Sequence, residues 1–327
     1  MFSIVMQSTI ACMIPLLIVA LGGVFSERSG IINLALDGEM IFGAFIGAIF
    51  CRVMIQNNIM AATSQWLFVL AMLVSMVAGM LLSLLLSFAA IKMKADQTIA
   101  GTALNILAPA IVCAFGLLFF SSEKISSGAN FVLTSSSYSN KAFSSAVANN
   151  KFLGFFFDKV YISTYICIIL FILLSIWLYK SKVGTHLRAC GEHPQAADSV
   201  GINVYRMRYL GTSISGALAG LGGFVYIATI AGTIAESQVD GLGFLALAIM
   251  IFGNWNPVFI ALGSLLFGFL KCLGVLAPQI PFLSNLNLPM YFYNMIPYII
   301  VIVVLIITHN KSGCPKAEGI PYDKGQR

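Results

Sequence analysis

Two carboxylates and one amide stand at the start of an otherwise apolar segment. Asn33 and Asp37 are four residues apart, so both lie on one face of a regular helix, while Glu39 points elsewhere. Because an ionised group is costly in an apolar phase, such side chains face a water-filled path or a polar partner. Alternatively, Asp37 and Glu39 lie at a membrane interface, where water and headgroups solvate them. We favour the first interpretation and predict that Asn33, Asp37 and Glu39 line a pathway for a solute.

A second set of polar residues opens the apolar segment that begins near residue 98. Gln97, Gly101 and Asn105 recur every four residues and form one small, polar stripe on a helix. Such a stripe either lines a translocation path or joins two helices through hydrogen bonds. Both interpretations stay open, and Gln97 and Asn105 are included among the candidate pathway residues.

The longest polar interruption in the second half of the chain is the stretch Gly184–Arg208. Within it, Pro194–Val200 begins with proline and is followed by Gly201, which is the expected asymmetry of a short helix. Seven residues give a helix of roughly 10 Å, too short to cross a bilayer. Ala196 and Ala197 in its middle are small, so another surface can approach its backbone closely. The stretch is therefore predicted to be a docking element between two membrane spans.

Composition places these residues in a membrane protein. Hydrophobic residues make up 59% of the 327 residues, charged residues make up 9%, and the mean hydropathy is +0.94. No soluble domain of this length is so poor in charge, and the apolar runs are continuous rather than alternating as in a β-barrel. We predict an all-α, polytopic membrane protein in contact with lipid. The net charge of +6 lies in loops, so it indicates topology rather than a nucleic-acid partner.

Windows of about 20 apolar residues predict the spans. The region 241–275 is too long for one crossing and is interrupted at Gly253–Pro257, so it divides into two short or tilted helices. The total is then about nine, within a range of about 8–10, and the first segment is taken as a retained span rather than a cleaved signal. The predicted spans lie at about 8–25, 35–55, 66–90, 98–120, 159–180, 209–231, 241–275 and 291–308.

Lysines and arginines set the orientation. They gather in the turn at residues 92–94, in the loop at about 181–208 and in the tail 309–327, and we place all three in the cytoplasm. The Ser/Asn-rich loop at about 121–158 then lies outside. The N-terminus also lies outside, unless residues 26–44 form a broken, re-entrant segment.

One cation and two glycine patterns lie inside apolar segments. Lys271 is expected to extend its ammonium group to an interface rather than bind an anion. With so little fixed positive charge in the membrane, a neutral, hydrogen-bonding solute fits better than an anion. The patterns Gly43–Gly47 and Gly216–Gly220 each place two glycines four residues apart, which predicts close helix packing.

The sequence lacks the motifs of ATP hydrolysis, nucleophilic catalysis, metal binding and a disulfide framework. No GxxxxGK[ST] motif occurs, so the chain cannot hydrolyse ATP alone. No nucleophile–base pair is apparent, and the histidines lie outside the spans, so neither a catalytic site nor a metal site is predicted. The seven cysteines are scattered without a CxxC motif, which argues against a disulfide framework.

Taken together, these residues resemble the permease subunit of bacterial ABC importers for nucleosides and simple sugars, within the wider superfamily of branched-chain amino acid, ribose and nucleoside permeases. Ala35, Asp37 and Glu39 depart from the residues usual in that family. The similarity covers nearly the whole chain outside the loop at about 121–158. It rests on four stretches: Glu27–Gly38, the segment Gly184–Arg208 continuing into Gly216–Gly223, Gly243–Pro257 and Gly319–Gly325.

The resemblance implies one permease domain over residues 1–327 in the bacterial cytoplasmic (inner) membrane, with a cytoplasmic C-terminus. It implies that a separate ABC ATPase receives the short helix in a groove, and that ATP and Mg²⁺ bind to that partner, with no cofactor on this chain. A second permease of different but homologous sequence and an extracytoplasmic solute-binding protein are the other expected partners. The residues expected to couple to the ATPase are Arg188, Gly191, Glu192, Pro194, Ala196, Ala197 and Gly201.

For the solute, the resemblance favours purine nucleosides, with simple sugars of the ribose or galactose type as the alternative. A proton-coupled secondary transporter is the rival from another class, with Asp37 and Glu39 as proton carriers. It would not require an ATPase, whereas the docking segment argues for one.

Overall fold

The structure, a computed structural model, describes residues 2–134, 147, 150–277, 289–308 and 313–325. Parts of the predicted outer loop and of the tail therefore lie outside the described residues. The helices are α1 (Phe2–Arg28), α2 (Leu36–Gln56), α3 (Gln65–Ile91), α4 (Gln97–Phe120), α6 (Lys151–Phe157), α7 (Ile162–Lys180), α8 (Lys182–Glu192), α9 (Pro194–Ser199), α10 (Val204–Thr229), α11 (Leu242–Phe252), α12 (Pro257–Leu276) and α14 (Met290–Thr308). Short antiparallel pairs join β1 (Ile125–Ser126) to β4 (Ile234–Ala235) and β2 (Val132–Leu133) to β3 (Val160–Tyr161).

The predicted all-α, polytopic class is confirmed. Seven of the described helices are long and apolar enough to cross a bilayer, and two shorter apolar helices lie at Leu242–Phe252 and Phe292–Val304. The predicted division of 241–275 is also confirmed, because α11 and α12 are separate helices. Asn256 accepts a hydrogen bond from the amide of Val258, 3.0 Å away, and thereby caps α12.

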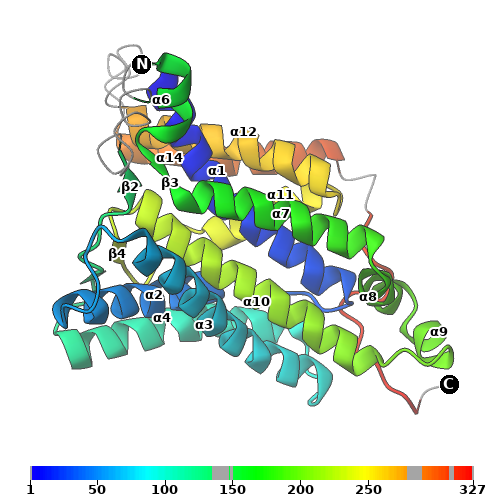
Figure 1. Cartoon of the computed structure of the whole chain (residues 1–327). Helices are drawn as coiled ribbons and strands as arrows, with labels where there is room; N and C mark the ends of the chain where they lie inside the picture. The colour runs from blue at the N-terminus through cyan, green and yellow to red at the C-terminus, as the bar shows by residue number, and fades with distance from the viewer. Residues whose placement is uncertain (1, 135–146, 148–149, 278–288, 309–312, 326–327) are drawn as a thin grey trace.

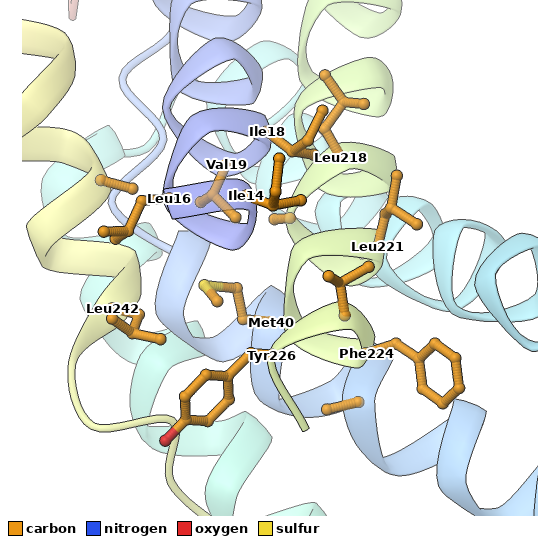
Figure 2. Packing of buried hydrophobic residues seen from close by; sticks show 14 of the residues in the cluster. Ile14, Leu16, Ile18, Val19, Met40, Leu218, Leu221, Phe224, Tyr226 and Leu242 are labelled. Carbon is orange, nitrogen blue, oxygen red and sulfur yellow. The ribbon is translucent and has the colours of Figure 1, made fainter. Parts of the chain in front are cut away.

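Helix α1 lies centrally, in contact with α7, α10, α11 and α12 (Figure 1). From Leu16 to Phe25 its residues are buried on every side, which fits a helix that is apolar all round. Figure 2 shows Ile14 and Ile18 of α1 beside Leu218 of α10, inside the largest apolar cluster of the described chain. Helices α7, α10, α11 and α12 therefore surround α1, whereas α2 and α3 pack against α10.

Close approach of α2, α3 and α10 depends on glycine. A Cβ atom placed on Gly43 of α2 would lie 2.3 Å from the Cα atom of Gly220 in α10. A Cβ atom on Gly79 of α3 would lie 2.2 Å from the carbonyl oxygen of Gly216. Both small-residue patterns thus form helix contacts, as predicted, because only glycine lets the backbones meet at these distances.

The two ends of the molecule carry different segments (Figure 1). The side-chain amide of Gln7 in α1 donates 3.0 Å hydrogen bonds to the carbonyl oxygens of Phe155 and Asp158, so the N-terminal end lies beside the predicted outer loop. At the opposite end lie α8, α9 and the C-terminal tail. Lys94 and Asp323 are 2.5 Å apart there, so the three basic segments share one end, as the charge pattern predicted.

Candidate functional site

The segment between α1 and α2 contains a buried polar cluster. Asn33 donates from Nδ2 to both oxygens of Glu39, at 3.2 and 3.0 Å, and to Ser215 Oγ of α10 at 2.9 Å. All three side chains are fully buried. The prediction that Asn33 and Asp37 share a helix face is wrong, because α2 begins at Leu36. Asn33 precedes the helix in a turn, and from there its amide reaches Glu39 instead.

The polar stripe of α4 faces that same segment. Gln97 accepts a 2.8 Å hydrogen bond from the amide of Ile32, and Asn105 accepts one of 2.8 Å from the amide of Gly38. Asn105 also donates to the carbonyl of Leu34 at 2.6 Å. These side chains satisfy backbone groups that the break between α1 and α2 leaves without helical partners. The stripe therefore joins two elements, which is the packing alternative of the sequence analysis.

Asp37 and Asn105 are the two half-buried residues among the candidate pathway residues, and Asp37 is the one that carries a charge. It is half-buried, and its Oδ1 accepts a 2.8 Å hydrogen bond from the amide of Gly243 in the first turn of α11. Asn33, Glu39 and Gln97 are buried by comparison. A carboxylate is favourable at a helix N-terminus because the first amides have no helical partners. Asp37 thus joins α2 to α11 and still has accessible surface.

Lys271 in α12 does not extend to an interface, contrary to the sequence-based expectation. Its side chain is 4% exposed, and Nζ lies 3.4 Å from Asp240 Oδ2. A buried ammonium group is tolerated because the carboxylate compensates its charge. The sequence pointed to no partner for it, since the two residues are 31 positions apart and lie in different elements.

The predicted docking segment folds as two helices. α9 covers Pro194–Ser199, one residue shorter than predicted, and Gly201 has a φ of 87°, which favours glycine. Ala196 is exposed, but Ala197 is 4% exposed and packs in an inner cluster. Of the two small residues predicted to couple to the ATPase, Ala196 thus lies on the outer side of α9, whereas α9 turns Ala197 toward the protein.

Helix α8, which the sequence did not predict, attaches this segment to α1. A Cβ atom on Gly191 would lie 2.4 Å from the carbonyl oxygen of Arg28, so α8 and the end of α1 are in backbone contact. The Arg28 Nη1 atom lies 3.6 Å from Glu192 Oε1. Arg188 stacks 5.0 Å from the ring centroid of Tyr179 and donates to its carbonyl at 3.3 Å. The predicted residues at 188, 191 and 192 therefore lie where α8 meets the membrane helices.

The C-terminal tail binds the same assembly. The amide of Ala317 donates to the carbonyl of Gly191 at 2.9 Å, and Arg208 Nη1 donates to the carbonyl of Ile320 at 3.0 Å. Tyr322 is buried, with its ring centroid 5.3 Å from that of Tyr205. The tail thus joins α8 to α10, a role that its composition did not indicate.

Trp255 is another residue that sequence reasoning left without a role. Its Nε1 atom donates to Glu27 Oε2 at 2.5 Å, and both side chains are buried. Tyr179 donates to the carbonyl of Trp255, also at 2.5 Å. The turn between α11 and α12 is therefore bound to the end of α1. The available signal was a tryptophan in a polar break, which needs a hydrogen-bond acceptor when buried.

These features define a multi-pass membrane protein whose basic loops and tail lie together at one end. Comparison with known proteins gives its family. The chain belongs to the family described as the permease component of branched-chain amino acid transport systems, which matches residues 5–305.

The similarity to several named proteins extends over nearly the whole chain. It is 38% identical to the guanosine ABC transporter permease protein NupQ of Bacillus subtilis, over 99% of this chain and 98% of the relative. It is 36% identical to the nucleoside ABC transporter permease protein NupC of Lactococcus lactis, over 95% and 94% of the two chains. A putative glucose ABC transporter permease protein of Haloferax volcanii is 26% identical over 87% of this chain and 81% of its own. No solved structure was found to match.

Proposed function

We propose that this chain is the membrane-spanning permease subunit of an ATP-driven importer for nucleosides, with purine nucleosides as the preferred solutes. The observation that carries the proposal is the near-full-length similarity to permeases named for guanosine and for nucleosides. Lys271 in α12 is paired with Asp240, so its charge is compensated and does not offer a site for an anion, which agrees with a neutral solute.

A separate ABC ATPase would supply the energy and would bind ATP and Mg²⁺, so this chain itself would need neither a cofactor nor a catalytic site. The exposed side of α9, including Ala196, together with Val200 directly after the helix, is the surface proposed to enter a groove of that ATPase. Val200 is 76% exposed and is therefore accessible to a partner. This assignment places the α9 end, and with it the C-terminus, in the cytoplasm.

Transmission from the ATPase to the membrane would follow the packing around α8. Gly191 lies against the backbone at Arg28, so a displacement of α8 is transferred to the end of α1. Because α1 contacts α7, α10, α11 and α12, its displacement reaches these helices directly, and it reaches α2 and α3 through α10. Interiors packed at this density shift as bodies rather than absorb the motion locally.

The pathway is proposed to pass Asp37, with Asn33, Glu39, Gln97 and Asn105 holding the backbone around it. Asp37 is the member of this set whose carboxylate is half-buried and lies at the start of α11. A second permease and an extracytoplasmic solute-binding protein would complete the importer, in a bacterial cytoplasmic (inner) membrane.

Uptake of labelled guanosine, adenosine and ribose tests the proposal directly. Vesicles would carry this chain with its ATPase, second permease and binding protein, and the control would carry an ATPase that binds but does not hydrolyse ATP. We expect ATP-dependent nucleoside uptake that ribose does not compete with. Ribose uptake alone would keep the importer and change the solute to a simple sugar. Uptake that persists with the inactive ATPase would indicate a secondary transporter instead.

A further inference from the structure

Asp240 stands at a backbone break between α10 and α11. Asp240 and Gly241 have φ values of 51° and 65°, so two consecutive residues take the left-handed conformation just before α11 begins at Leu242. Positive φ is costly for a residue with a side chain. The break turns the Asp240 side chain away from the helix, and 51% of that side chain is exposed.

The Asp240 carboxylate is held from one side only. Tyr226 donates to Oδ2 at 2.9 Å, and Lys271 Nζ lies 3.4 Å from the same oxygen. The hydroxyl of Tyr298 donates to the Asp240 backbone carbonyl. Figure 2 shows the Tyr226 hydroxyl directed away from the apolar cluster, toward the segment that leads into α11. Among the described residues, the other carboxylate oxygen, Oδ1, has no hydrogen-bond partner.

The lengths of α11 and α12, counted from the turn that joins them, put the Asp240 group within the thickness of a bilayer. α11 has 11 residues and so rises about 16 Å from the turn at its C-terminal end to the break at Asp240. Lys271 is 14 positions beyond Pro257 (271 minus 257), which corresponds to about 21 Å along α12. The apolar core of a bilayer is about 30 Å thick. An exposed carboxylate at this depth is expensive against lipid, so its free face requires water or a polar group.

Asp37 approaches the same helix N-terminus from α2. Its Oδ1 accepts from the amide of Gly243, only three residues after Asp240, and its side chain is also half-buried. Two partly exposed carboxylates therefore flank the start of α11. Lys271 compensates one of the negative charges, so the surface offers hydrogen-bond acceptors without a strong positive field.

We propose that Asp240 contacts the solute and helps to determine its specificity, with Oδ1 accepting a hydrogen bond from a neutral solute that carries O–H or N–H donors. A ribose hydroxyl or a nucleobase N–H group has this chemistry. Tyr226 and Lys271 are positioning residues, because they hold Oδ2 and leave Oδ1 free. The inference rests on the proposed importer function and adds a specific contact to it.

The first test compares Asp240→Asn with wild type in the complete importer, reconstituted in proteoliposomes. Asparagine keeps the shape but replaces one carboxylate oxygen by a donor, so we expect at least a tenfold loss of guanosine uptake at limiting concentration. The pattern of competition by 2′-deoxy, 3′-deoxy and N-methylated nucleosides should also change. Glu236→Gln is the matched control, because Glu236 lies in the same connecting segment but pairs with Lys124 at 2.8 Å. It should transport like wild type.

A second test does not depend on the activity of the variant. Asp240→Cys, in a Cys314→Ser background, is treated with a water-soluble methanethiosulfonate reagent, and guanosine should slow its modification. Absence of modification would mean that lipid or the second permease covers Asp240, and modification without protection would mean that no solute binds there. Either result, or wild-type uptake and competition in Asp240→Asn, would overturn the inference. If wild type itself transports neither nucleosides nor ribose, the proposed function fails first and the inference with it.

Discussion

Asn33 lies 3.0 Å from Glu39 across the corner between α1 and α2, and its amide also reaches Ser215 of α10 at 2.9 Å. The same Asn33 side chain accepts a hydrogen bond of 3.0 Å from the amide of Ala35. One buried amide thus holds the non-helical corner, the first turn of α2 and the middle of α10. The corner sets the position of Asp37, two residues before Glu39.

Replacing Glu39 distinguishes hydrogen bonding from charge. The structure places no cation against Glu39 among the described residues, so Glu39→Gln keeps an acceptor for Asn33 and should change stability by less than about 1 kcal/mol. Glu39→Ala leaves the amide of Asn33 without these acceptors and should cost about 1–3 kcal/mol. Thermal unfolding in detergent measures both. An equal loss of stability in Glu39→Gln and Glu39→Ala would mean that the charge of Glu39 is required.

The close approach of α10 to α3 at Gly220 should tolerate no added methyl group. Gly220→Ala would bring a Cβ atom to 2.3 Å from the Ser75 carbonyl, so the helices must separate at a cost of about 1–3 kcal/mol. Gly263→Ala is the matched control, since a Cβ atom there meets only a side-chain carbon of Ile249 at 3.2 Å. The control should be neutral or stabilising, because alanine favours a helix. Thermal unfolding in detergent measures both variants, and equal unfolding midpoints for Gly220→Ala and Gly263→Ala would contradict this packing.

Two neighbouring alanines in α9 should respond differently to tryptophan. Ala196 is exposed, so Ala196→Trp should fold normally and block ATPase docking, with nucleoside uptake reduced at least tenfold. Ala197 packs with Cys190, Val204 and Tyr322, so Ala197→Trp should lower the unfolding temperature itself. Co-purification with the ATPase and thermal unfolding separate the two effects. Normal ATPase binding and uptake by Ala196→Trp would remove α9 from the docking surface.

Binding of the tail should depend on Tyr322 rather than on the salt bridge beside it. Tyr322 is buried against Tyr205, and truncation of a buried aromatic costs about 3–5 kcal/mol in a core. Tyr322→Ala should therefore release the tail and make it sensitive to protease. Lys94→Ala removes an exposed partner of Asp323 and should have little effect, because exposed ion pairs contribute about 0–1 kcal/mol. Greater protease sensitivity in Lys94→Ala than in Tyr322→Ala would contradict this ranking.

Tail binding should also weaken as pH rises. Burial raises the pKa of the Glu318 carboxyl, although the Cys314 thiol and Arg28 act to lower it. The pKa of the Glu318 carboxyl is therefore higher in the folded protein than in the unfolded chain. Its contribution to stability is complete below the unfolded pKa and is lost as the pH rises through the folded pKa. Hydrogen exchange of residues 313–325, corrected for intrinsic rate, should show better protection at pH 5 than at pH 8. Glu318→Gln should remove the difference; a wild-type difference that survives in this variant would exclude Glu318 as its cause.

The sequence by itself determined the membrane class, the positions of the spans and the short helix at Pro194. These depend on local properties: an apolar run is long enough to cross a bilayer whatever its neighbours, and proline and glycine limit a helix through their own backbones. The division between α11 and α12 was predictable for the same reason, since Asn256 and Pro257 form a capped helix start.

Only the tertiary structure decided which polar groups meet. Asn33 faces Glu39 because α2 starts at Leu36, and Lys271 faces Asp240 because a backbone break turns that carboxylate toward α12. Helical periodicity predicts neither, because it assumes a regular helix where the chain is bent. The inward face of Ala197 and the binding of the tail to Gly191 likewise depend on contacts between distant segments. Spacing along the chain predicts only which residues are neighbours on one helix. A buried charge needs a compensating partner to offset its desolvation, and that partner can come from any segment of the fold.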